Sequence, residues 1–242
     1  MNRSSRKFTR VWWTLLAGPL LFLLAIIGAS LYFGFVTRGQ NAEAIPGMVA
    51  ASTPYQLAVV QIWLLLILVK SMKRDGMTWK DIGWENAGGQ RISREVLIGG
   101  GLGIALGLLY VFALSPALAR LQQIWDYVPA GELFTSLGAS LVPFLIANVL
   151  LAPFVEESIY RGYGFTRLLG RFNQPAAIAL TCFFFGILHW AGGFWYILAT
   201  GMIAGGLFAW LRVSRKNVIA PFAAHLAVNI VEAVFIAATV GM

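Results

Sequence analysis

The chain of 242 residues is 59% hydrophobic and only 12% charged, and its mean hydropathy is +0.75. Soluble domains contain about 25% charged residues, so this composition excludes an ordinary soluble domain and indicates a polytopic membrane protein. The single cysteine, Cys182, excludes an internal disulfide and a metal site built from several cysteines.

The apolar segments predict an all-α fold, a polytopic membrane bundle of about seven transmembrane helices that forms one domain over residues 1–242. Each span is expected to be a helix because the segments are too long and too continuously apolar for barrel strands. The apolar part of the first span is longer than the hydrophobic core of a signal peptide, so we expect this span to be retained in the protein. In chain order the predicted spans are 11–36, 54–72, 95–118, 137–160, 175–191, 194–212 and 217–240.

The basic residues indicate topology. The formal net charge of +8 would also suit a nucleic-acid-binding protein. However, all Lys and Arg residues except Arg38 and Arg120 lie before the first span or beside the connections after the second, fourth and sixth. The positive-inside rule then places the N-terminus in the cytoplasm and the C-terminus outside. We therefore expect a multi-pass protein of a bacterial cell membrane, with lipids and not nucleic acid as partners.

Glycines form a stripe in the third predicted span. Gly99, Gly103 and Gly107 recur every four residues and predict a smooth face that another helix can approach closely. Gly201 and Gly205 predict the same in the sixth span. These residues indicate packing and no chemistry.

Two adjacent acids, Glu156 and Glu157, end a long apolar run. An ionisable group at mid-membrane costs about 2.5–3.5 kcal/mol, so it is expected to be paired or functional. Glu157 and Arg161 are four positions apart and predict an ion pair on one helix face. Glu156 points about 100° away from Glu157 and has no local partner. Glu156 is therefore the candidate for chemistry.

Both histidines of the chain lie in apolar helices. His189 and Glu156 are equidistant from the turn 171-RFNQP-175, so we expect them to face each other at one depth. His225 shares a helix face with Asn229, four positions on, and with Glu232. We expect Glu156, both histidines and Asn229 to converge in one cavity.

These four side chains are a minimal set for amide hydrolysis by water. A carboxylate beside a neutral imidazole can deprotonate a water molecule, and a second histidine with an amide can stabilise the oxyanion. The alternative is a buried polar network that fixes helix packing. One carboxylate and two imidazoles would also suit zinc. The HExxH spacing is absent, and zinc on Glu156 would leave no free base, so we expect no metal or cofactor, with zinc as the alternative.

Three blocks, 156-EESIYR-161, 185-FGILH-189 and 225-HLAVN-229, resemble the motifs of the CPBP, or Abi, family of intramembrane glutamic peptidases. This family is related to the type II CAAX prenyl endopeptidases. The resemblance covers a catalytic helix core over residues 137–240 and implies a membrane-embedded endopeptidase.

The resemblance also implies roles for single residues. Glu156 resembles the glutamate that activates water, with His189 holding that water. His225 and Asn229 resemble an oxyanion hole. Glu157 and Arg161 resemble a supporting ion pair, and Phe185 matches a packing position. Glu232 lies outside the motifs, where either orientation of His225 or polar packing would explain it.

The substrate class implied is a membrane-associated protein or peptide, which is prenylated in some branches of the family and a bacteriocin or other peptide in others. Two rival functions stay open. One is a non-catalytic membrane immunity factor or scaffold. The other is a proton-coupled transporter, which would more often show inverted repeats. The sequence contains no such repeat.

Overall fold

The computed structural model describes residues 3–38, 41–85, 91–124 and 141–240, and every element in them is helical. The all-α class is confirmed. Of the labels below, η1 and η7 are 3₁₀ turns and the other η segments are π-helices. In chain order the elements are α1 (Arg3–Val36), η1 (Ala42–Ala44), α2 (Ile45–Ala51), α3 (Thr53–Asp75), α4 (Ile92–Leu109), η2 (Tyr110–Leu114), α5 (Ser115–Gln123), α6 (Leu141–Leu145), η5 (Ile146–Leu151), α7 (Ala152–Glu157), η6 (Ser158–Gly164), α8 (Phe165–Leu169), α9 (Gln174–Leu188), η7 (Trp190–Gly192), α10 (Phe194–Leu198), η8 (Ala199–Ala204), α11 (Gly205–Arg215) and α12 (Ile219–Val240).

Six helical stretches among the described residues are long and apolar enough to cross a membrane. The expected multi-pass bundle is therefore confirmed. The fifth predicted span corresponds to α9, which is apolar but only 15 residues long. It stops at His189 because a 3₁₀ turn follows, and Gly193 then adopts a φ of +84° that favours glycine. The six stretches are Phe8–Val36, Thr53–Asp75, Ile92–Leu121, Val142–Leu169, Phe194–Arg215 and Ile219–Ala238.

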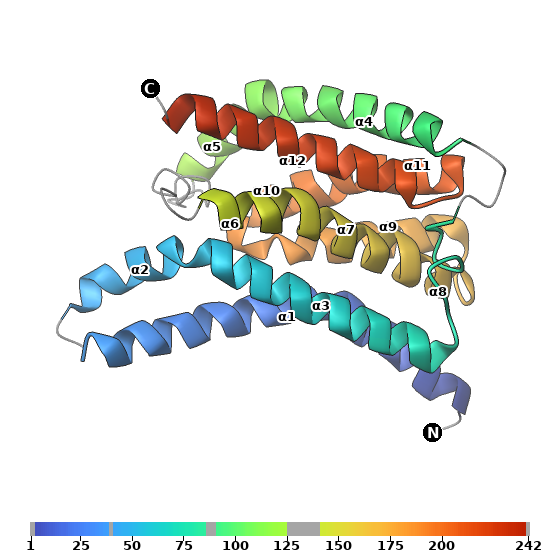
Figure 1. Ribbon diagram of the computed structural model, residues 1–242, viewed down its shortest axis with the longest axis horizontal. Coiled ribbons are helices and arrows are strands. Elements are labelled where there is room, and N and C mark those ends of the chain that lie inside the picture. Colours follow the sequence, from blue (N-terminus) through green and yellow to red (C-terminus); the bar gives the residue numbers. More distant parts are fainter. Residues whose placement is uncertain (1–2, 39–40, 86–90, 125–140, 241–242) are drawn as a thin grey trace.

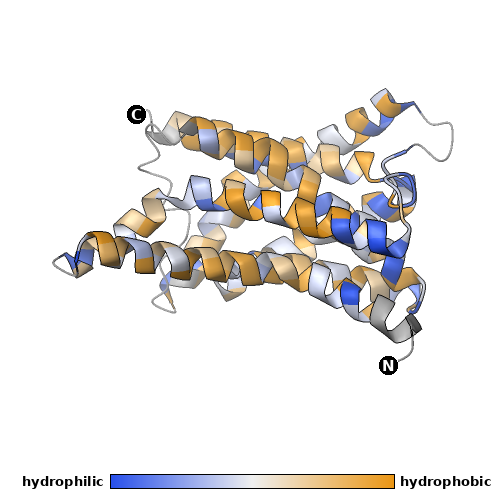
Figure 2. Ribbon diagram, turned by 60° about the horizontal axis from the view of Figure 1, so that its bottom comes forward, coloured by the Kyte–Doolittle hydropathy of each residue, from blue (hydrophilic) through white to orange (hydrophobic). Residues whose placement is uncertain are grey.

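The helices pack in pairs around the motif-bearing segments. In Figure 1, α1 and α3 lie along one side of the bundle, α4 and α12 along the other, and α6, α7 and α9 between them. The N-terminus and the C-terminus lie at opposite ends. Hydrophilic residues gather at the end that carries the N-terminus (Figure 2). This arrangement matches the predicted sorting of basic residues, while the orientation in the membrane stays a prediction.

Buried ion pairs tie the helices together at this polar end. Asp75 at the end of α3 pairs with Arg10 of α1 and lies 3.2 Å from Arg167 of α8, and it accepts a hydrogen bond of 2.9 Å from the Tyr163 hydroxyl. Because the Asp75 side chain is completely buried, these partners compensate for the loss of its hydration. The contacts fix the end of α3 against the segment that follows the two acids.

The glycine stripe of α4 lies against α12, as predicted. A β-carbon on Gly99 would lie 2.1 Å from the carbonyl oxygen of Ala220, and one on Gly103 would lie 2.2 Å from that of Ala224. The two backbones are therefore in direct contact. Because α12 carries the third motif, this contact sets the position of that motif relative to the rest of the bundle.

In or directly after three of the four π segments that the structure describes, a backbone carbonyl accepts a hydrogen bond from a side chain that is distant in the sequence. A wide π turn disturbs the regular i to i−4 hydrogen bonds, and within lipid the freed groups need other partners. Asn229 donates to Asn148 O at 2.7 Å, and Arg212 donates to Arg161 O at 2.8 Å. Beyond the end of η8, Arg161 donates to Gly205 O at 3.0 Å. The polar side chains of the core thereby satisfy the irregular backbone.

Candidate active site

The two adjacent acids face different helices. Both are buried, with 4% of Glu156 and none of Glu157 exposed. Glu157 Oε1 accepts hydrogen bonds from Arg161 Nη1 at 3.3 Å and from His225 Nδ1 at 2.9 Å. Glu156 Oε1 accepts from Gln61 Nε2 of α3 at 2.7 Å. The pair Glu157–Arg161 was predicted and is present.

Glu156 has no described partner on its own helix, as expected, but the distant residue Gln61 donates a hydrogen bond to it. Gln61 is fully buried and lies 95 positions away in the sequence, in a span that the motifs do not cover. The signal that could have found it is a single amide near the middle of an otherwise apolar helix, since polar side chains inside a membrane bond across helices. Only one oxygen of Glu156 is used, because Oε2 has no hydrogen bond to any residue the structure describes.

Arg161 is the central cation of the site and is 1% exposed. Besides Glu157 and the Gly205 carbonyl, its guanidinium carbon lies 4.1 Å from the centre of the Phe185 ring. The same ring contacts His189 at 4.9 Å and His225 at 5.8 Å between centroids. Phe185 therefore packs between the charged network and both histidines, as the packing role predicted for it requires.

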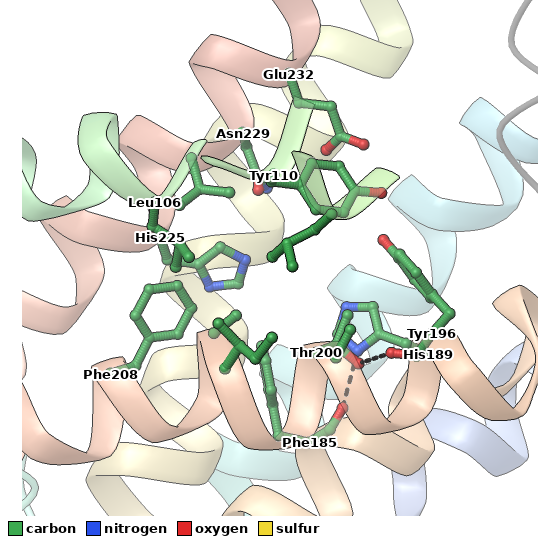
Figure 3. Close-up of a pocket in the computed structure, with 15 residues that line it drawn as sticks. Leu106, Tyr110, Phe185, His189, Tyr196, Thr200, Phe208, His225, Asn229 and Glu232 are labelled. Atoms are coloured by element: carbon green, nitrogen blue, oxygen red, sulfur yellow. Dashed lines mark hydrogen bonds between the residues drawn. The ribbon is translucent and has the colours of Figure 1, made fainter. Parts of the chain in front are cut away.

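His189 ends α9 and is half-buried. Its Nδ1 lies 2.8 Å from the carbonyl oxygen of Phe185, one turn earlier. A carbonyl only accepts, so Nδ1 carries a proton and Nε2 is the free nitrogen of the neutral ring. The ring is one of the labelled side chains that surround the cavity in Figure 3.

His225 is held from two directions. Nδ1 donates to Glu157, and the ring stacks on Phe208 at 4.9 Å and 19°. Its Nε2 is therefore the nitrogen left for a ligand. Asn229, one turn further along α12, uses one of its two amide hydrogens on Asn148 O and keeps the second. Both side chains are buried, and both line the same cavity as His189.

The cavity has a volume of about 70 Å³, which is enough for water. The structure thus brings together three of the four predicted residues. Glu156 is not part of the lining, contrary to the expected convergence, because its carboxylate faces Gln61. It still interacts electrostatically with His225 and with Tyr196 of the cavity wall. The polar residues that line the cavity are Tyr110, His189, Tyr196, Thr200, His225, Asn229 and Glu232.

The side chains that the structure describes do not form the ligand set that zinc would need. Among the described residues, no three His, Cys, Asp or Glu side chains are grouped to hold a metal ion. The predicted alternative required Glu156 with both histidines, whereas the nearest described partner of Glu156 is an amide. The expectation of a reaction without metal or cofactor stays a prediction.

Residues 138–231 match the family model described as type II CAAX prenyl endopeptidase Rce1-like. This segment is therefore similar to the Rce1-like family. It contains all three motifs, so the resemblance seen in the sequence is confirmed, and the matched family is one of membrane proteases. No curated protein and no solved structure matches the chain. Gln61 and Tyr110 precede the Rce1-like segment, and Glu232 directly follows it.

Proposed function

We propose that the chain is an intramembrane endopeptidase in which Glu156 activates water against a peptide bond. The observation that carries the proposal is the convergence of His189, His225 and Asn229 on one cavity inside the Rce1-like segment. Glu156 interacts electrostatically with His225, and one of its oxygens accepts no hydrogen bond from the described residues. The family makes a membrane-associated protein or peptide the expected substrate class.

The proposed reaction begins with a water held between Glu156 Oε2 and His189 Nε2. Glu156 takes a proton from the water as the oxygen attacks the scissile carbonyl carbon, and the carbonyl oxygen becomes an oxyanion. Collapse of the tetrahedral intermediate breaks the carbon–nitrogen bond. The proton on Glu156 passes to the leaving nitrogen, which regenerates the carboxylate. Gln61 holds Glu156 Oε1 throughout and so orients the second oxygen.

The oxyanion is proposed to receive two hydrogen bonds. Asn229 supplies the amide hydrogen that Asn148 does not use. His225 donates from Nε2, which requires a doubly protonated ring because Nδ1–H is already directed at Glu157. Removing a single oxyanion donor typically costs about 10²–10³ in rate.

The test uses purified protein and a peptide library, with product masses compared between wild type and variants. Glu156→Gln and His189→Ala should reduce cleavage by about 10²–10⁴. Glu43→Gln, at an exposed carboxylate of η1, is the matched control and should cleave as wild type. Equal product from Glu156→Gln and wild type would refute the peptidase. A cellular phenotype that survives Glu156→Ala would favour the scaffold.

A further inference from the structure

Glu232 lines the same cavity and has no function assigned by the motifs. It lies three positions after Asn229 and seven after His225, on the same face of α12, and Figure 3 shows its carboxylate beside the Tyr110 ring. Its expected role as an orienting partner of His225 is not needed, because Glu157 occupies His225 Nδ1. Within the described part of the chain, the Glu232 carboxylate makes neither a hydrogen bond nor an ion pair.

The neighbouring hydroxyls of the cavity wall are already engaged. The side chains of Tyr110 and Tyr196 interact with each other, and Tyr110 also interacts with Ser115. Their rings meet edge to face at 6.5 Å. The hydroxyl of Thr200 donates to the carbonyl of Tyr196 at 2.7 Å. Among the described residues, none of these hydroxyls donates a hydrogen bond to Glu232.

A carboxylate that lines a small cavity inside the membrane and accepts no hydrogen bond from the described residues can bind a donor or cationic group of a ligand. We propose that Glu232 is a specificity-determining residue, which recognises a cationic group of the substrate such as a lysine ammonium, an arginine guanidinium or a free amine. This inference rests on the proposed peptidase function. The negative charge of Glu232 disfavours a substrate whose free C-terminal carboxylate would lie beside it.

The helix geometry sets the distance of this cation from the scissile bond. Seven residues of α12 separate Glu232 from His225, which corresponds to about 10.5 Å along the helix axis. An extended peptide advances about 3.3–3.6 Å per residue. A peptide that runs along α12 from the oxyanion site therefore places its third residue from the cleaved bond at Glu232.

The test is a set of model peptides that carry Lys, Ala or Glu at each of four positions on both sides of the cleaved bond. Wild type should cleave the peptide with Lys at the third position with at least about tenfold higher kcat/KM than the Ala peptide, as expected for a desolvated charge pair. Glu232→Gln should bring this ratio close to one. Glu232→Asp should retain the preference, and Glu43→Gln should behave as wild type.

The result that overturns the proposal is a Lys-to-Ala ratio that is the same in wild type and Glu232→Gln. A preference that persists in Glu232→Gln but disappears in Glu232→Leu would also overturn it, because a neutral hydrogen bond would then select the substrate. If Glu232→Gln or Glu232→Leu fails to fold, peptide binding is compared between wild type and Glu232→Asp, whose side chains carry the same charge but differ in length.

Binding to an inactive background separates this inference from the peptidase itself. Peptide affinities are measured on Glu156→Gln and on the double variant with Glu232→Gln. Charge-selective binding without any cleavage by wild type overturns the peptidase and supports the cationic subsite. Cleavage without charge preference overturns the subsite and supports the peptidase. Absence of both binding and cleavage overturns both.

Discussion

Replacing Gly103 by alanine should separate α4 from α12. The added β-carbon would lie 2.2 Å from the carbonyl oxygen of Ala224 and 2.7 Å from its α-carbon. Because non-bonded heavy atoms pack at about 3.5 Å, the helices would have to move apart by about 1 Å. Both obstructing atoms belong to the backbone, so no side-chain rotation relieves the contact. We expect a loss of about 1–3 kcal/mol, the usual cost of overpacking.

The matched control is Gly101→Ala in the same helix, where a β-carbon would meet nothing within 4 Å. Both substitutions change helix propensity in the same way, so the difference between them isolates the packing against α12. Thermal or denaturant unfolding of the purified protein in detergent measures the stability of both variants. Gly103→Ala should unfold well before Gly101→Ala and should lose peptide cleavage, since α12 carries His225 and Asn229. Equal unfolding midpoints for the two variants would refute the close backbone contact.

Three further outcomes are expected. Gln61→Leu should lower kcat about tenfold or more with little change in KM, because Glu156 loses the hydrogen bond that positions it. The stability of the protein should not fall, because the substitution also removes the Gln61 amide oxygen, which is buried without a partner among the described residues. An unchanged kcat would contradict the positioning role. Arg161→Leu should destabilise the protein by about 3–5 kcal/mol, because it leaves Glu157 and the Gly205 carbonyl buried with fewer partners. The exposed Arg91→Leu is its control in the same unfolding measurement. In intact cells, a tag at the C-terminus should react with an impermeant reagent and one at the N-terminus should not; the reverse pattern would contradict the predicted orientation.

Local spacing predicted the parts of the site that depend on one helix. The ion pair Glu157–Arg161 follows from a separation of four residues, which one helix turn brings together whatever the rest of the fold does. The close approach of another helix to α4 follows from the glycine stripe for a similar reason, since a face without side chains allows close approach, but the stripe does not identify that helix as α12. The placement of both histidines on one cavity followed from the three motifs together.

The partners that the two acids find on other helices could not be predicted, because they depend on how the helix is rotated within the bundle. A π segment precedes α7 and another follows it, and each adds a wide turn that changes the direction of the side chains beyond it. The apolar residues in these segments carry no periodic signal that distinguishes a π turn from an α turn. A tertiary contact such as Gln61–Glu156, formed between residues 95 positions apart, is likewise not encoded in local spacing.

The different roles proposed for the two adjacent acids are consistent with their charge partners. The proposed oxyanion hole requires His225 to carry a second proton, and a lone imidazolium in this buried position would lack compensation. Glu157 contacts both His225 and Arg161, so its carboxylate can balance the ring without leaving the guanidinium, which is also held by a backbone carbonyl and by the face of Phe185. Glu156 has only an uncharged partner and keeps one oxygen unbonded to the described residues. A carboxylate that must accept and release a proton is better placed beside an amide than beside a fixed cation, because a cation would oppose its protonation. The observed pairing therefore suits Glu156, and not Glu157, as the base.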